Sequence, residues 1–167
     1  MNDLLKLLKI RRSVRVFQDK NISKDKLEEI VDTARFAPTA RNVQPWEFVV
    51  IMDKSRLAEI ANLGQNAKFM AKAAACIAVF SADTNYFLED GSAATCNILL
   101  AATALGIGSC WIAGDKKPYC QQVSSLLKAP TGLKLISLIA LGYPQEENAF
   151  KIAEKRAIEE LLHWEKF

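Results

Sequence analysis

Apolar side chains recur along the chain at two spacings, which predict alternating helices and strands. Spacing of three to four residues, typical of a helix with one buried face, occurs at 3–10, 23–37, 53–64, 91–105, 118–127 and 153–162. Short apolar runs at 48–52, 75–81 and 133–141 predict buried strands, and a shorter strand is expected within 106–114. The alternation predicts helices layered around a sheet, in a single domain over residues 1–167.

The segment 91–105 is the most apolar of the predicted helices. Small and apolar residues occupy nearly all sides of this helix, among them Ala94, Ile98, Leu99 and Ala102. A helix without a polar face is buried, so we expect it at the centre of the domain or against a partner subunit. A short polar connection, 83–89, is expected to precede it.

Composition and charge exclude several classes of protein. The 167 residues are 50% hydrophobic and 25% charged, as in folded globular proteins, and the net charge of +3 gives no strong case for nucleic acid or an acidic membrane. No apolar run approaches the ~20 residues that span a bilayer, and no signal peptide is recognised. The four cysteines form no Cys-x-x-Cys pair, which favours a reduced, cytoplasmic location.

The histidine content restricts the possible chemistry. The chain has one histidine, His163, so metal sites built from several imidazoles are excluded. A Ser-His-acid triad would depend on this residue near the C-terminus. We therefore expect neither a metal centre nor a hydrolytic one.

A basic cluster follows the first predicted helix. Arg11, Arg12, Ser13 and Arg15 place three guanidiniums and a hydroxyl within five residues. Guanidiniums so close together repel one another unless solvent or an anion neutralises them, and their donor geometry matches phosphate oxygens. The cluster is therefore either a phosphate site or a solvated basic turn.

A polar loop lies between the second helix and the first strand. Pro38 ends the helix because its ring removes a backbone donor, and Thr39, Asn42 and Gln44 follow with hydrogen-bonding groups. Loops held by rigid elements often carry binding groups, although an ordinary helix-to-strand connection has the same pattern.

A glycine-rich turn precedes Ile112, Ala113 and Gly114. Gly106 and Gly108 permit positive φ and close backbone approach, so the turn could aim a backbone N–H at a flat ligand. Read structurally, the same glycines are a helix cap and a bulge.

These segments together resemble the nitroreductase family, FMN-dependent enzymes that work as homodimers. The loop resembles the family's Pro-x-x-x-Asn-x-Gln-Pro-Trp motif, the basic cluster its first FMN-binding motif, and residues 106–112 its Gly-x-Gly-Ser-Cys-Trp-Ile segment. Residues 139–144 match the end of a strand in the family closely, so the resemblance covers almost the whole chain in order. It implies a homodimeric α+β fold with a mixed or antiparallel sheet flanked by helices.

The resemblance also implies where FMN contacts the protein. Arg11, Ser13, Lys155 and Arg156 would bind the phosphate, with Lys151 as a further candidate, and Arg15 would face the N1/O2 edge of the ring. The Ala113 N–H would meet flavin N5, and Gln65 or Asn66 the pyrimidine edge. The full predicted set is Arg11, Arg12, Ser13, Arg15, Pro38, Thr39, Asn42, Gln44, Gln65, Ile112, Ala113, Gly114, Lys155 and Arg156.

The second subunit is expected to complete each site. In the family the loop matching Thr39 to Asn42 reaches the partner's FMN, and the tail near Trp164 and Phe167 packs over the other subunit. NADH or NADPH would reduce FMN and leave, after which a nitroaromatic, quinone or similar planar acceptor would enter, giving ping-pong kinetics. The flavin carries the chemistry, so no catalytic side chain is expected.

Two alternatives remain open. One is a specialised flavoprotein of the same family, of a dehalogenase or flavin-destroying type. The other is a non-enzymatic module whose basic turn grips nucleic acid or an acidic peptide.

Overall fold

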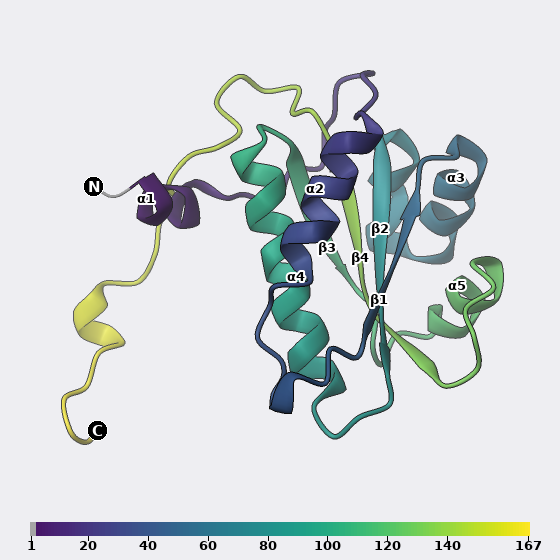
Figure 1. Ribbon diagram of the computed structural model, residues 1–167. Helices are drawn as coiled ribbons and strands as arrows, with labels where there is room; N and C mark the ends of the chain where they lie inside the picture. The colour runs from purple at the N-terminus through teal and green to yellow at the C-terminus, as the bar shows by residue number, and fades with distance from the viewer. Residues whose placement is uncertain (1–2) are drawn as a thin grey trace.

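A four-stranded antiparallel sheet forms the centre of the computed structural model, which describes residues 3–167 (Figure 1). The strands, in the spatial order β1-β2-β4-β3, are β1 (Trp46–Ile51), β2 (Ala75–Ala82), β4 (Leu133–Gly142) and β3 (Gly108–Ala113). The helices are α1 (Asp3–Ile10), α2 (Lys24–Ala34), α3 (Lys54–Leu63), α4 (Phe87–Ala104) and α5 (Cys120–Leu126). Three 3-10 segments, η1 (Ala40–Asn42), η2 (Gln65–Lys72) and η3 (Ile158–Glu160), complete the described chain.

The sheet is buried on both faces, which explains its nearly continuous apolar strands. Helices α2 and α4 cover one face, while α3, η2 and α5 cover the other (Figure 1). Seven consecutive residues of β2, from Ala75 to Ser81, are buried. Such double-sided burial removes the polar alternation that a half-exposed strand shows. The predicted layered α+β fold is thus confirmed, with a sheet that is wholly antiparallel.

Helix α4 occupies the position that its apolar sequence predicts. It packs against α2 and across β2, β3 and β4, and its inner side is buried from Asp90 to Thr103. A Cβ at Gly91 would lie 2.7 Å from a side-chain carbon of Ile136, so only glycine lets the helix approach β4 this closely. The buried hydroxyls of Thr95 and Ser137 satisfy each other at 2.7 Å.

Most predicted element boundaries hold within a few residues. Asp53 caps α3 as expected, because its carboxylate accepts a hydrogen bond from the Arg56 N–H at 2.9 Å. Strand β1 begins at Trp46 rather than Phe48. The prediction of a polar connection over 83–89 was wrong at its end, since α4 already begins at Phe87.

The predicted tail helix over 153–162 was wrong. Only Ile158–Glu160 forms a 3-10 turn, and the rest of the segment is irregular chain lying away from the body of the protomer (Figure 1). A short helix is marginal in water unless its apolar face packs on something. Within this protomer the tail has no buried residue, so its sequence pattern has no surface to pack against. Over residues 3–167, none of the helices combines the length and apolar character needed to cross a membrane.

Candidate functional site

A cleft of about 470 Å³ opens beside β3, one of the two edge strands of the sheet. Its wall combines the segment after α1, the η2 turn and the β3 strand itself. It brings together four of the predicted residues, Arg15, Gln65, Ile112 and Ala113. The complete lining is Arg15, Gln65, Asn66, Lys68, Phe69, Cys110, Trp111, Ile112, Ala113 and Lys117.

Arg15 reaches this cleft because its segment runs alongside β3. Ser13 pairs with Ser109 in a parallel bridge, and the Val14 N–H donates to the Ser109 carbonyl at 2.9 Å. Gly108 makes this approach possible, since a Cβ there would lie 2.8 Å from the Val14 Cβ. Gly106, with φ of 71°, follows the end of α4 as the predicted cap. The glycine turn therefore accommodates the chain's own basic segment.

The free edge of β3 presents backbone groups to the cleft. The Ser109 carbonyl faces away from β4, toward Val14, whereas the Gly114 N–H donates to the Ile136 carbonyl of β4 at 3.0 Å. Because antiparallel strands alternate the direction of their backbone groups, Ala113 turns its N–H toward the cleft. Its carbonyl accepts a hydrogen bond from the Tyr119 hydroxyl. The Ala113 N–H is therefore available to a ligand, whereas the Gly114 N–H is committed to the sheet.

Positive charge gathers at two further hollows near the basic cluster. One, of about 480 Å³ between α1 and the tail, is lined by Leu8, Lys9, Arg11, Arg12, Ile152, Ala153 and Lys155. The other, of about 330 Å³, is lined by Arg12, Ser13, Val14, Arg15, Val16, Pro144, Glu146, Ala149 and Lys151. The ion pairs found within residues 3–167 include none of Arg11, Arg12 and Arg15. This charge is uncompensated, as an anion site requires.

The two basic residues of the tail behave differently. Lys155 lines the same hollow as Arg11 and Arg12. Arg156 instead forms an ion pair with Glu160, with 2.9 Å between Nε and Oε2, and also donates to the Glu160 carbonyl. In this protomer the structure therefore brings Lys155, but not Arg156, to the basic cluster. Lys151 lies in the neighbouring hollow, beside Ser13.

The predicted loop lies elsewhere in the protomer. Pro38, Thr39, Asn42 and Gln44 precede β1, the strand at the opposite edge of the sheet from β3. The loop contacts the N-terminal end of α4. The basic cluster contacts β3 at Ser109, which lies shortly after the C-terminal end of α4. Helix α4 has 18 residues, or roughly 27 Å at 1.5 Å per residue. One chain therefore keeps the two halves of the predicted site apart.

Cys110 forms part of the cleft wall as a neutral thiol. Burial raises the pKa of Cys110, and this effect outweighs the opposite influence of Arg15, the Ser13 hydroxyl and Arg11. A thiol with a raised pKa is protonated at neutral pH and is a poor nucleophile. The cleft thus offers cations, amides and flat apolar surface, and no activated nucleophile among its lining residues.

Aromatic residues complete the cleft, and the sequence analysis did not single them out. The guanidinium carbon of Arg15 lies 5.9 Å from the centroid of the Phe69 ring, within reach of a cation–π contact. Trp111 is 37% exposed beside the cleft. Trp111 belongs to a motif that the sequence shows. Phe69 lies in the 3-10 segment η2, and its place in the cleft wall beside β3 has no periodic signal in the sequence.

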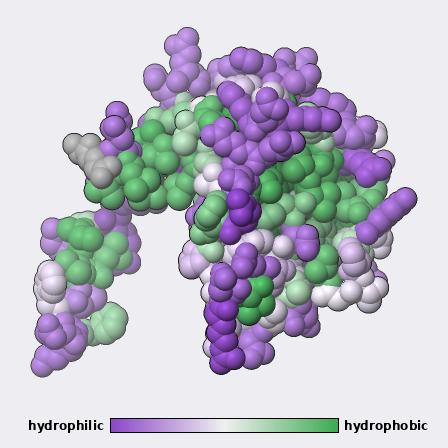
Figure 2. Space-filling model, viewed as in Figure 1, coloured by the Kyte–Doolittle hydropathy of each residue, from purple (hydrophilic) through white to green (hydrophobic). Residues whose placement is uncertain are grey.

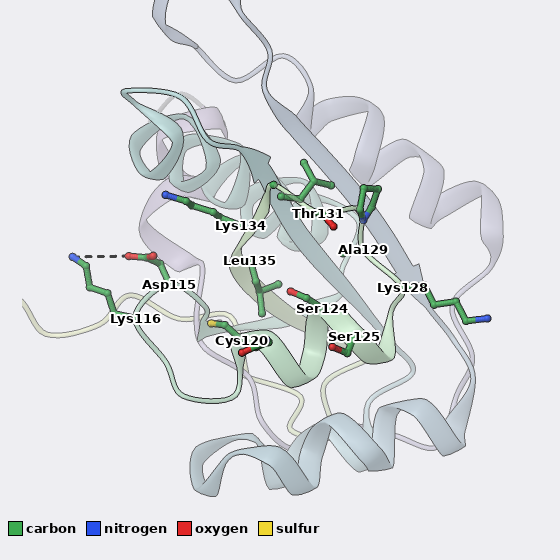
Figure 3. A pocket seen from close by; sticks show the side chains of 14 residues that line it. Asp115, Lys116, Cys120, Ser124, Ser125, Lys128, Ala129, Thr131, Lys134 and Leu135 are labelled. Atoms are coloured by element: carbon green, nitrogen blue, oxygen red, sulfur yellow. Dashed lines mark ion pairs between the residues drawn. The ribbon is translucent and has the colours of Figure 1, made fainter.

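Another cavity of about 470 Å³ lies between α5 and the start of β4 (Figure 3). It contains none of the predicted residues. Lys116 and Lys134 form ion pairs with Asp115 and Asp83, with 3.9 Å and 2.7 Å between the ammonium nitrogen and the carboxylate oxygen. The side chains of Lys128 and Lys134 point away from the cavity in Figure 3. Its charge is therefore largely compensated or outward-facing, which makes it a weaker anion site than the basic cluster.

Comparison with known proteins identifies similar sequences and structures. The model of the "Nitroreductase family" matches residues 8–68 and 57–143. An Archaeoglobus fulgidus protein, provisionally named an NADH dehydrogenase/NAD(P)H nitroreductase, is 35% identical, with 100% of both chains covered. An FMN-dependent nitroreductase structure from Clostridium difficile has a TM-score of 0.89 at 29% identity, covering 98% of this chain and 99% of the other. A provisionally named nitroreductase from Desulfovibrio desulfuricans, solved with FMN, has a TM-score of 0.83 at 28% identity, covering 100% and 99%.

Proposed function

Because the chain belongs to the nitroreductase family, and is therefore an oxidoreductase, we propose that it is an FMN-dependent NAD(P)H oxidoreductase. Its acceptors are nitroaromatics, quinones or similar planar molecules. The whole of residues 1–167 acts as one FMN-binding domain in a cytoplasmic homodimer. The four free cysteines are compatible with a reducing compartment.

The observation that carries this proposal is the arrangement of uncompensated charge around the β3 cleft. A flat ligand with an anionic tail needs an apolar slot, polar groups at its rim and cations at one end. Phe69, Trp111 and Ile112 line the cleft, together with the polar side chains of Gln65 and Asn66. The hollow that contains Lys151 shares Arg15 with the cleft, and it shares Arg12 with the hollow that contains Lys155. These residues fit FMN.

Each group has a role that follows from its position. Arg11, Arg12, Ser13 and Lys155 hold the phosphate through charged hydrogen bonds. The Ala113 N–H donates to the N5 edge of the ring. FMN, when bound, supplies the hydride and electron transfer, so the protein's task is to bind, orient and adjust its potential. Arg15 would adjust the potential, because it places positive charge where the reduced ring would gather negative charge.

Exposed apolar surface supports the homodimer. Leu5 and Leu8 on α1 are 50% and 46% exposed, and the separate tail exposes Trp164 at 78%. Figure 2 shows apolar surface over α1 and again on the tail. A groove of about 340 Å³ between α1, α2 and α4 adds Phe36 and Leu100 to this surface. Exposed apolar surface of this kind marks an interaction site, and a second copy with the same surfaces can bury it symmetrically.

The separation of loop and cleft supports sites shared by two chains. The Thr39 to Gln44 loop lies at the far edge of its own sheet from the β3 cleft. In a two-fold dimer it contacts the FMN held by the partner, and the tail packs over the other subunit. The apolar residues of the tail, which pack on no surface within one protomer, then pack on the partner.

The same cleft serves NAD(P)H and the acceptor in turn, which gives ping-pong kinetics. The test is an anaerobic screen of the purified protein with NADH and NADPH against nitroaromatic and quinone acceptors. We expect a yellow protein that releases FMN on denaturation. Its steady-state kinetics should give parallel double-reciprocal plots. A colourless protein that cannot be loaded with FMN would contradict the proposal and favour a non-enzymatic basic module.

A further inference from the structure

The loop between α2 and β1 is held by one buried carboxylate. The Thr39 hydroxyl donates to Asp90 Oδ2 at 3.0 Å, and the Ala40 N–H donates to Asp90 Oδ1 at 3.1 Å. The Thr39 hydroxyl also accepts the Gln44 N–H at 3.2 Å, which closes the loop on itself. Asp90 thus connects the first turn of α4 directly to Thr39 and Ala40 and, through the Thr39 hydroxyl, to Gln44.

Asp90 has no cationic partner that would explain its burial. It is 5% exposed, and the ion pairs found within residues 3–167 do not include it. A buried carboxylate is costly unless charged hydrogen bonds and a favourable field compensate. The two loop bonds and the N-terminal end of α4 supply that compensation. The carboxylate is therefore committed to the loop.

The loop that it holds has a strained backbone and exposed side chains. Arg41, Asn42 and Gln44 have φ of 54°, 56° and 53°, in the left-handed region that side chains other than glycine rarely adopt. Residues 41–44 are all exposed, so packing within the protomer does not impose this conformation. Strain that the surrounding structure maintains is concentrated at ligand-binding segments.

We propose that Asp90 is a positioning residue for the cofactor, acting through Thr39 and Ala40 to preset the loop that meets the partner subunit's FMN. The inference rests on the proposed function, because it takes the loop to be part of an FMN site. Asp90 itself does not touch the flavin. It fixes the strained conformation before the cofactor arrives, so that FMN binding does not have to order the loop.

The test compares FMN affinity in Asp90→Ala, Asp90→Asn and Thr39→Val with the wild-type protein. Losing a charged hydrogen bond should weaken FMN binding on the order of tenfold or more in Asp90→Ala. Asp90→Asn should retain most of the affinity, because its amide oxygen still accepts the Ala40 N–H and its NH₂ can donate to Thr39. Thr39→Val should act in the same direction as Asp90→Ala, and the effects of the two substitutions should be less than additive in the double variant, because both remove the Thr39–Asp90 bond.

Glu89→Ala is the matched control, since Glu89 is the exposed acidic neighbour in the same helical turn. It removes a charge from α4 without removing a loop bond and should leave FMN affinity unchanged. Amide exchange of Ala40 in the FMN-free protein, with flavin circular dichroism of the loaded protein, separates positioning from general stability. We expect faster Ala40 exchange and an altered flavin signal in Asp90→Ala but not in Asp90→Asn.

Two results would overturn the inference in distinguishable ways. If the wild-type protein binds FMN and Asp90→Ala binds it equally tightly, the positioning role is wrong while the proposed function stands. If the wild-type protein cannot bind FMN at all, the proposed function fails, and the inference fails with it. A variant that fails to fold leaves Asp90→Asn and Thr39→Val to decide.

Discussion

Removing the Arg15 guanidinium should lower the midpoint potential of bound FMN. Arg15 lines the β3 cleft, and within residues 3–167 its guanidinium makes a long 3.5 Å hydrogen bond to the Ser13 carbonyl and no ion pair. Its charge is thus available to the ligand. Two unit charges 4 Å apart interact by about 1 kcal/mol in water and about 4 kcal/mol at an effective dielectric constant of 20. Arg15 is exposed, so its interaction energy lies below the upper figure.

We therefore assign Arg15 about 1–3 kcal/mol of preference for the reduced over the oxidised ring. For a two-electron couple about 1.4 kcal/mol corresponds to 30 mV, so Arg15→Ala should lower the potential by roughly 20–60 mV. FMN retention should change less, because the phosphate contacts remain. Arg15→Lys keeps the positive charge, so its midpoint potential should stay close to that of the wild-type protein.

The assay is anaerobic redox titration of the loaded protein against a reference dye, with stopped-flow reduction by NADH and NADPH. Lys117→Ala is the matched control, because it removes one positive charge from the same cleft at an exposed position and should shift the potential less. An unchanged potential and reduction rate in Arg15→Ala, with FMN fully bound, would refute the assignment.

Two further predictions concern the fold. Gly114→Ala should destabilise the protein by about 1–3 kcal/mol in urea unfolding, because its Cβ would lie 2.5 Å from the backbone carbon and oxygen of Ile136. In Gly64→Ala the nearest atom belongs to the movable Tyr119 side chain, at 3.1 Å, so the loss should be smaller, and an equal loss would contradict the packing argument. Burial raises the pKa of Cys76 from 9.0 to about 12, so the unfolded thiol loses its proton first and stability should fall between those pH values by up to about 1.4 kcal/mol per unit. Cys76→Ala should reduce that slope, measured by unfolding at several pH values, and an unchanged slope would show that Cys76 does not cause it.

The periodic part of the fold was predictable from the sequence because its signals are local. Doubly buried strands read as apolar runs, and α4 is apolar because it packs on the sheet and against α2. The tail was mispredicted because helical spacing alone does not make a helix. Its apolar residues need a surface that one protomer does not offer.

The candidate site was predictable only in part, for a related reason. Arg15 and Ala113 belong to recognisable motifs, and the structure brings them to one cleft. Phe69 and Asp90 reach their places through tertiary folding, the first by way of an irregular turn and the second through a buried contact 50 residues from Ala40. An acidic residue in the first turn of a helix reads as an ordinary dipole partner, so its commitment to the loop has no sequence signal.

The most direct test of the account is whether FMN binding and dimerisation are lost together. Light scattering and flavin absorbance are recorded on the same samples across a dilution or mild urea series. Because the loop and the β3 cleft of one chain lie at opposite sheet edges, we expect FMN release to track dissociation of the dimer. A fully loaded, active monomer would contradict the account.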